Sequence, residues 1–205
     1  MEKYCVIISG GEETAVSLPA ADAFVIACDK GYEYARRQNI SVDLIVGDFD
    51  SAERPCKESA ELLVYPSEKD DTDTMIAVRR ALNDGFTDIR IFCALGGRAD
   101  HSLANMQSAA FAAKNGARVT LCGRECTMYF INNTSLSLPR IQKHSLSVFA
   151  FSDTCSGVTL KGTKYTLSDA DICNTFPIGV SNEWVKDTAH VSVKDGVLAV
   201  VVCCM

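Results

Sequence analysis

The sequence contains no apolar run of the length that crosses a bilayer, which takes about 20 residues. Its apolar stretches, such as those at 4–9, 23–28 and 197–204, are much shorter, and no charged-then-apolar leader precedes a small-residue cleavage site. Only five prolines occur, and 47% of the residues are hydrophobic against 22% charged. This composition is typical of a folded globular protein. We therefore expect a cytoplasmic protein with no membrane partner.

The chain also lacks an excess of basic residues, because its formal net charge is −6. Affinity for the nucleic-acid backbone normally comes from lysine and arginine, so we expect no nucleic-acid partner. The phosphate-binding pattern GxxxxGK[ST] is absent, and so is the spaced GxGxxG pattern. These absences exclude a P-loop nucleotide hydrolase and a simple Rossmann dinucleotide-binding domain.

Cysteine is plentiful, with ten residues, but no Cys-x-x-Cys pair occurs. The adjacent Cys203 and Cys204 would point to opposite faces of a strand, which argues against a zinc site. Free cysteine within an apolar run behaves as a small hydrophobic residue. Six cysteines fall within or beside such runs, namely Cys5, Cys28, Cys93, Cys122, Cys203 and Cys204. We expect these six to fill the core.

The first part of the chain alternates short apolar strands with helical stretches, which predicts a mostly parallel sheet with helical crossovers. Helices are expected near 30–38, 72–82 and 101–115. After about residue 123 the sequence changes to short β-type runs with turns between them. We therefore predict an α/β domain at 1–124, followed by a small all-β sandwich or barrel domain at 125–205.

The clearest candidate site is VDLIVGDFDS, in which an apolar strand runs into Gly47, Asp48, Phe49, Asp50 and Ser51. In open α/β sheets ligands bind at the carboxyl ends of the strands, where these carboxylates would fall. Asp48 and Asp50 are two residues apart in an extended segment, so they can share one face and bind a metal. An acidic, solvated turn after the strand is the alternative.

Lys69 and three aspartates occupy a second loop between a strand and a helix, at 69–73. One aspartate suffices to cap a helix, and Asp71 with Thr72 satisfies that need. Three aspartates beside a lysine instead suggest phosphate and Mg²⁺ binding, to which the helix N-terminus adds positive potential.

A third such loop, GGRADH at 96–101, offers the Arg98 guanidinium for bidentate phosphate binding and Asp100 to orient it or cap the helix. Weaker signals of the same kind follow the first two strands, at 9–11 and 29–31. A capped turn explains each loop nearly as well when it is taken alone. Their occurrence at successive strand ends favours a single site. An acidic protein that binds phosphates needs a cation such as Mg²⁺ as a bridge between its carboxylates and the phosphates.

Taken together, GDFDS at 47–51, KDDTD at 69–73, GGRADH at 96–101 and SNE at 181–183 resemble the thiamine pyrophosphokinase family. That family pairs an α/β nucleotide-binding domain with a β-sandwich domain that binds thiamine. The resemblance implies Mg²⁺-dependent transfer of the terminal diphosphate of ATP to the hydroxyethyl oxygen of thiamine, which gives thiamine diphosphate and AMP. It also implies a homodimer whose thiamine sites combine domains of two subunits.

The resemblance also implies roles for individual residues. The Mg²⁺ ligands and catalytic carboxylates would be Asp48, Asp50 and Asp73, with Asp100 as a further catalytic residue near the phosphates. The side chains that bind the nucleotide and its phosphates would be Asp29, Lys30, Lys69, Thr72 and Arg98. Tyr165 would offer an aromatic face to thiamine, and Ser181 and Asn182 would contact its pyrimidine.

Two other functions fit parts of the sequence. The segment DFDS at 48–51 resembles the nucleophile and acid of a haloacid dehalogenase-type phosphatase. In that class the motif follows the first strand, whereas here it follows the third, and the β-rich second half does not fit. A non-catalytic nucleotide or thiamine sensor would keep the fold and be expected to lose the acidic cluster, but Asp48, Asp50 and Asp73 are all present.

Overall fold

The computed structural model describes residues 3–19, 22–47, 60–64 and 70–205. Asp48, Asp50 and Lys69, three of the predicted site residues, therefore lie outside the described residues. The chain divides into two compact units, Met1–Arg124 and Glu125–Met205. In the part of the chain that the structure describes, no helix is both long and apolar enough to cross a membrane.

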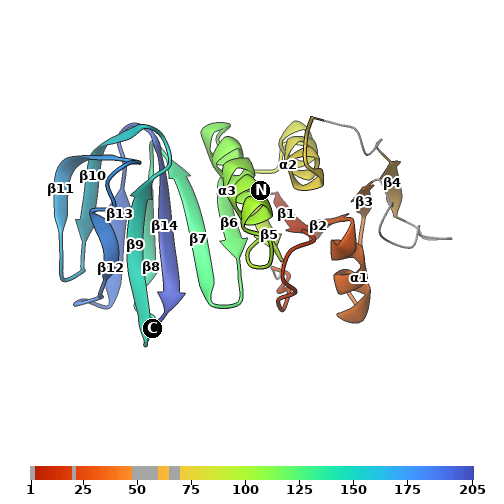
Figure 1. Ribbon diagram of the computed structural model, residues 1–205, viewed down its shortest axis with the longest axis horizontal. Coiled ribbons are helices and arrows are strands. Elements are labelled where there is room, and N and C mark those ends of the chain that lie inside the picture. Colours follow the sequence, from red (N-terminus) through yellow and green to blue (C-terminus); the bar gives the residue numbers. More distant parts are fainter. Residues whose placement is uncertain (1–2, 20–21, 48–59, 65–69) are drawn as a thin grey trace. The chain divides into compact units, whose positions relative to one another are not determined.

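The first unit is a parallel sheet with helical crossovers (Figure 1). Its elements are β1 (Tyr4–Ile8), β2 (Ala23–Cys28), α1 (Lys30–Arg37), β3 (Leu44–Gly47), β4 (Glu61–Val64), α2 (Asp73–Asn83), β5 (Asp88–Phe92), α3 (Ala99–Lys114) and β6 (Arg118–Cys122). The strands follow the order β6-β5-β1-β2-β3-β4, and each described pair is parallel. The three helices agree with the predicted helices to within about two residues, the usual uncertainty of helix ends.

The strand order reverses direction at β1, because the chain first adds β2, β3 and β4 on one side and then β5 and β6 on the other. Such a reversal leaves a crevice outside the carboxyl ends of the central strands, and ligands of open α/β sheets bind there. The central strands are buried on both faces, as in Val6 and Ile7 of β1, which explains their continuous apolar runs.

The second unit is built of antiparallel strands. Its strands are β7 (Cys126–Asn132), β8 (Ser135–Pro139), β9 (His144–Ala150), β10 (Thr154–Lys161), β11 (Leu167–Cys173), β12 (Gly179–Asn182), β13 (Thr188–Ser192) and β14 (Val197–Cys204). Four neighbouring strands follow the order β12-β9-β14-β7, and a separate four-stranded sheet has the order β11-β10-β13-β8. Side chains of both sheets, including Leu146, Leu160, Val191 and Leu198, form one buried cluster. The predicted fold class, a mostly parallel α/β part followed by an all-β part, is confirmed.

The cysteines correct one expectation from the sequence. Cys5, Cys28 and Cys93 are buried in the core as expected. Cys203 instead forms a disulfide with Cys126, and Cys204 is exposed. The physical reason is the register of β14 against β7, which places Cys203 directly opposite Cys126, with the two Cα atoms 4.2 Å apart.

Candidate active site

A pocket of about 350 Å³ opens in the crevice at the carboxyl ends of β1 and β2. It is formed by the segments that follow these strands and by the first turns of α2 and α3. The described residues that line it are Ser9, Gly10, Gly11, Cys28, Asp29, Lys30, Thr72, Asp73, Thr74, His101, Ala104 and Asn105. The structure thus brings together four of the residues predicted to bind nucleotide or metal, namely Asp29, Lys30, Thr72 and Asp73.

Asp29 links the end of β2 to the end of β3. Its φ of 44° lies in the left-handed region, which residues other than glycine rarely adopt. A Cβ atom on Gly47 would collide with Oδ1 of Asp29, so the carboxylate lies directly against the backbone of the last residue of β3. Gly47 immediately precedes Asp48 in the sequence, and only glycine leaves room for this close approach.

The first turn of α2 is held in place by contacts with the ends of β1 and β2. Thr72 caps the helix, because its Oγ1 accepts a hydrogen bond from the backbone N–H of Met75 at 3.2 Å. The buried hydroxyls of Thr74 and Ser9 are 2.8 Å apart, and the Cys28 thiol donates to the carbonyl of Asp73 at 3.6 Å. The N-terminus of this 11-residue helix, with its positive end, therefore faces the pocket.

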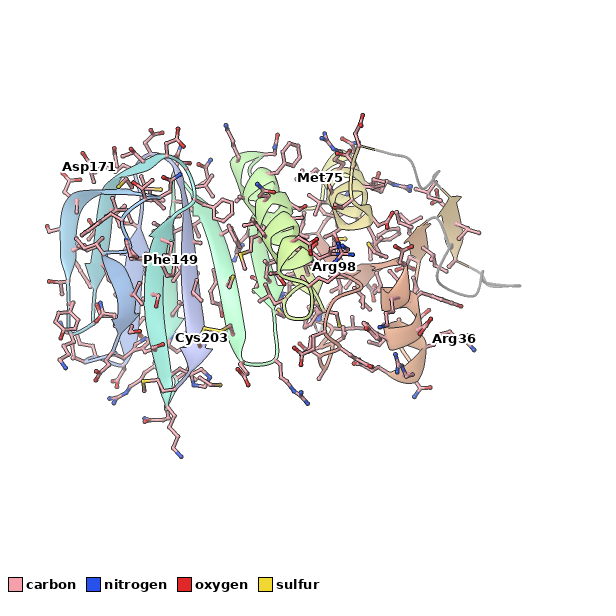
Figure 2. All side chains as sticks on the ribbon, viewed as in Figure 1. Arg36, Met75, Arg98, Phe149, Asp171 and Cys203 are labelled. Carbon is pink, nitrogen blue, oxygen red and sulfur yellow. A yellow bond between two sulfur atoms is a disulfide. The ribbon has the colours of Figure 1, made fainter. Side chains whose placement is uncertain are left out.

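Arg98, which is labelled in Figure 2, forms a two-pronged ion pair with Asp100 at the start of α3. The Nε–Oδ1 and Nη2–Oδ2 distances are 3.1 and 2.6 Å, and both side chains are exposed. This guanidinium lowers the pKa of the Asp100 carboxyl to about 2. Neither residue is among the described residues that line the pocket. They pair with each other beside it. Besides its contact with Arg98, Asp100 accepts a hydrogen bond at Oδ1 from the backbone N–H of His101 at 2.9 Å.

The structure adds pocket residues that the sequence analysis did not single out. His101, Ala104 and Asn105 occupy one face of α3, at the spacing that places helical residues side by side. Asn105 is buried, and its Nδ2 donates to the carbonyl of Ala94 at 2.8 Å. This bond ties α3 to the segment that leads into the glycine-rich loop. The signal in the sequence was an asparagine on a helix face that otherwise carries small residues, such as Ser108, Ala109 and Ala112.

A second group of predicted residues meets in the all-β unit, at Tyr165 and β12. Asn182 is buried, its Oδ1 accepts from the backbone N–H of Tyr165 at 3.0 Å, and its Nδ2 donates to the carbonyl of Tyr165 at 2.6 Å. The Tyr165 ring itself remains exposed. Ser181 has a φ of 55°, and its backbone N–H donates to Oγ of Ser147 at 2.9 Å. The structure therefore brings Tyr165, Ser181 and Asn182 together.

The donor set of the pocket suits a hard divalent cation. Asp29 and Asp73 supply carboxylate oxygens, and Thr72 and Ser9 supply hydroxyls. Within the described residues, no group of three or more acidic, histidine or cysteine side chains converges as a complete metal site. The predicted ligands Asp48 and Asp50 lie outside the described residues.

A second cavity of the first unit, of about 400 Å³, lies near the C-terminal ends of α2 and α3. Its lining includes Arg79, Phe86 and Phe111 but no carboxylate among the described residues. It adjoins the amino ends of the strands, away from the carboxyl ends where ligands of such sheets bind. It is therefore a poorer candidate for phosphate chemistry than the smaller pocket.

Both halves of the chain match family descriptions. Residues 17–121 match "Thiamin pyrophosphokinase, catalytic domain", and residues 133–198 match "Thiamin pyrophosphokinase, vitamin B1 binding domain". The chain is 30% identical over 161 residues to a thiamine pyrophosphokinase of Bacillus subtilis (strain 168), covering 76% of this chain and 75% of the relative.

Solved structures agree with these matches. A thiamin pyrophosphokinase family protein from Enterococcus faecalis is 28% identical and has a TM-score of 0.83, covering 99% of this chain and 100% of that one. Thiamine pyrophosphokinase from Bacillus subtilis has a TM-score of 0.86 at 24% identity, covering 99% and 100%, which supports the fold. From its sequence and its fold, this chain belongs to the thiamine pyrophosphokinase family.

Proposed function

We propose that the chain transfers the terminal diphosphate of ATP to thiamine. The hydroxyethyl oxygen of thiamine attacks the β-phosphorus, the bond from that phosphorus to the α,β-bridging oxygen breaks, and AMP leaves with that oxygen. The thiamine hydroxyl releases its proton to solvent, and thiamine diphosphate is the other product. The observation that carries the proposal is the carboxylate-lined pocket at the reversal of strand order, in a chain of this family.

Mg²⁺ is the proposed metal, with Asp73 as a ligand together with Asp48 and Asp50. When bound, it would neutralise charge on the transferred phosphates. Asp73 lies in the first turn of α2, and its backbone carbonyl accepts from Cys28. The helix thereby holds the carboxylate at the pocket. Such positioning is most of what phosphoryl transfer requires from a protein.

The nucleotide contacts are proposed for Asp29, Lys30, Lys69, Thr72 and Arg98. Lys30 begins α1 and lines the pocket beside Asp29, where its ammonium suits a phosphate. Arg98 already presents its guanidinium in the two-pronged geometry that binds carboxylates and phosphates. The low pKa of Asp100 makes it a weak proton acceptor, so we assign it to orienting Arg98 in catalysis and not to removing a proton.

Thiamine is proposed to contact Tyr165, Ser181 and Asn182. The exposed Tyr165 ring suits the cationic thiazolium, since cations bind to the faces of aromatic rings. The carboxamide of Asn182 is hydrogen-bonded to the backbone of Tyr165. Its contribution to thiamine binding would therefore come through the position of the Tyr165 segment. The homodimer with shared sites and the cytoplasmic location stay predictions, and sedimentation of the purified protein would test the dimer.

The first test is incubation of the purified protein with thiamine, ATP and Mg²⁺, followed by chromatography of the products. Equal amounts of AMP and thiamine diphosphate are expected. Phosphate release that does not need thiamine would indicate a phosphatase instead. No turnover, with thiamine or nucleotide still bound, would indicate a sensor.

Asp73→Asn tests the proposed metal ligand. It should lower turnover by roughly a hundredfold or more, because a neutral amide binds Mg²⁺ poorly. Asp71→Asn is the matched control, since Asp71 pairs with Arg79 on the surface of the same segment. Unchanged turnover in Asp73→Asn would remove Asp73 from the metal site, and thermal unfolding would show that both variants fold.

A further inference from the structure

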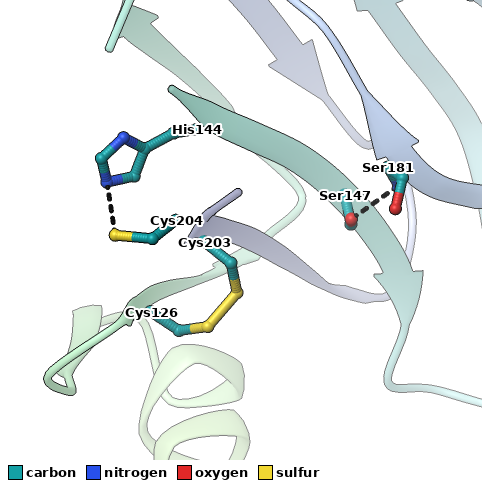
Figure 3. Close-up of a disulfide and its surroundings, with 6 residues drawn as sticks. All are labelled: Cys126, His144, Ser147, Ser181, Cys203 and Cys204. Carbon is teal, nitrogen blue, oxygen red and sulfur yellow. Dashed lines mark hydrogen bonds between the residues drawn. A yellow bond between two sulfur atoms is a disulfide. The ribbon is translucent and has the colours of Figure 1, made fainter. Parts of the chain in front are cut away.

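A cluster of sulfur and imidazole groups lies at one end of strands β7, β9 and β14 in the second unit (Figure 3). It consists of the Cys126–Cys203 disulfide, Cys204 and His144. We refer to it as the thiol cluster. The proposed reaction uses none of these residues.

His144 is oriented so that it accepts the proton of the Cys204 thiol. Sγ of Cys204 lies 3.2 Å from Nε2 of His144, and Nδ1 of His144 lies 2.8 Å from the carbonyl oxygen of Gln142. A carbonyl oxygen only accepts hydrogen bonds, so Nδ1 carries the hydrogen. In the neutral ring, Nε2 therefore presents its lone pair to the thiol.

Backbone bonds on both sides keep this pair together. The register of β14 against β9 places Cys204 directly opposite His144. The N–H of Cys204 donates to the carbonyl of Glu125, and the N–H of Met205 donates to the carbonyl of Lys143, both at 2.9 Å. The contact between thiol and imidazole is therefore built into the sheet.

The Cys204 thiol faces solvent and points away from the disulfide. Cys203 and Cys204 are consecutive on a strand, so their side chains leave opposite faces, as Figure 3 shows. Cys204 is exposed, whereas Cys5, Cys93 and Cys155 are buried. Burial raises the pKa values of these three thiols and raises the pKa of Cys122 to about 11. They are poor nucleophiles.

We propose that Cys204 is a modification site, at which a thiol activated by His144 forms mixed disulfides with small disulfides from solution. The thiol proton passes to Nε2 of His144, and the Cys204 sulfur attacks one sulfur of the small disulfide. That S–S bond breaks as the new one forms, and the other sulfur leaves as a thiolate that takes up the proton. Cys204 is oxidised to the disulfide level, and the leaving sulfur is reduced.

The test uses the full chain and the chromogenic disulfide dithiodipyridine, with peptide mass spectrometry to give the rate at each cysteine. Cys204 should react faster than Cys173, whose pKa is lowered by the Thr175 hydroxyl but which has no imidazole partner among the described residues. His144→Gln should slow Cys204 by about tenfold or more, because glutamine does not take the proton.

His190→Gln is the matched control, because His190 likewise lies on a strand but bonds to the hydroxyl of Ser137. It should leave the Cys204 rate unchanged. In denaturant the wild type and His144→Gln should react equally, which would separate activation by the imidazole from a defect in folding. A Cys204 rate that His144→Gln does not alter, or that falls below the Cys173 rate, would overturn the proposal.

Discussion

Two of the side chains assigned to substrates are carried by backbone that L-amino acids rarely adopt, namely Asp29 with φ of 44° and Ser181 with φ of 55°. Each such residue costs about 1–3 kcal/mol and persists only where surrounding contacts enforce it. Here the enforcing contacts are visible, because Gly47 packs against the Asp29 carboxylate and Ser147 binds the N–H of Ser181. This backbone conformation is not confined to the proposed sites, since Asn39, Cys93, Asn133, Lys143 and Asp169 adopt it as well.

The contact between Gly47 and Asp29 makes a specific prediction. Gly47→Ala should displace the Asp29 carboxylate, because the new Cβ would collide with Oδ1. We expect turnover to fall more than about tenfold, with a loss of about 1–3 kcal/mol in the free energy of unfolding from overpacking. Steady-state kinetics and urea unfolding measure the two effects. Wild-type kinetics in a folded variant would mean that the Asp29 carboxylate has no role in the reaction.

The Arg98–Asp100 pair makes a prediction about pH. The Asp100 carboxyl should titrate with a pKa of about 2 in NMR, and Arg98→Gln should return it toward its ordinary value, because the guanidinium is the main cause of the shift. A folded pKa below the unfolded value means that the pair's contribution to stability is present above about pH 4 and is lost as pH falls toward 2. An Asp100 titration that does not respond to Arg98→Gln would contradict this account.

Among the helices and strands, the short strand β12 matters most for the second site. Its last residue, Asn182, binds both backbone groups of Tyr165, which lies 17 residues earlier in the chain. A local hydrogen-bonded clamp of this kind holds an exposed aromatic residue in place without burying its ring. The strand therefore positions a residue that belongs to a different segment.

Asn182→Ala should loosen that clamp. We expect a rise of roughly tenfold in the KM for thiamine with the KM for ATP little changed, since the bonds concern only Tyr165 and its neighbours. The free energy of unfolding should fall by about 0.5–1.5 kcal/mol. The partly buried N–H of Tyr165 loses its partner, whereas the Tyr165 carbonyl still accepts from the Thr163 hydroxyl at 3.1 Å. Tyr165→Ala is the companion variant, and it should raise the KM for thiamine without the loss of stability. Equal effects on both substrates would refute the clamp.

For the molecule as a whole, each unit has its own buried core. The second unit also has a covalent cross-link, the Cys126–Cys203 disulfide, which joins residues 77 positions apart. Closing a loop of that length restricts the unfolded chain more than the folded one. The disulfide ties the first strand of the unit to its last.

Cys203→Ser should therefore lower the free energy of unfolding of the oxidised protein by about 2–4 kcal/mol. Urea unfolding with and without a dithiol reductant measures this loss, and reduction of the wild type should reproduce it. Cys204→Ser is the matched control, because it changes the neighbouring exposed thiol and leaves the bond intact. A variant as stable as the oxidised wild type would show that the cross-link contributes nothing.

The place of the first pocket could be predicted from local sequence. Parallel strands bring their carboxyl ends to one edge, so polar loops after successive strands had to converge, and Asp29, Lys30, Thr72 and Asp73 do line one pocket. Near residue 123 the sequence changes from alternating strands and helices to short β-type runs, and this change likewise predicted the all-β second part. Alternating and continuous apolar runs are patterns of neighbouring residues along the chain. They therefore predict strands and helices from the sequence alone.

Other features depended on pairings between distant residues, which no local pattern encodes. The Ser9–Thr74 bond joins residues 65 positions apart, and Asn182 reaches Tyr165 only because β12 ends beside it. Its apolar sequence context predicts a core position for Cys203. Only the register of β14 against β7 places it opposite Cys126. A shift of one residue in that register would turn each side chain to the other face, so the disulfide, like the pairing of Cys204 with His144, was decided by the tertiary structure.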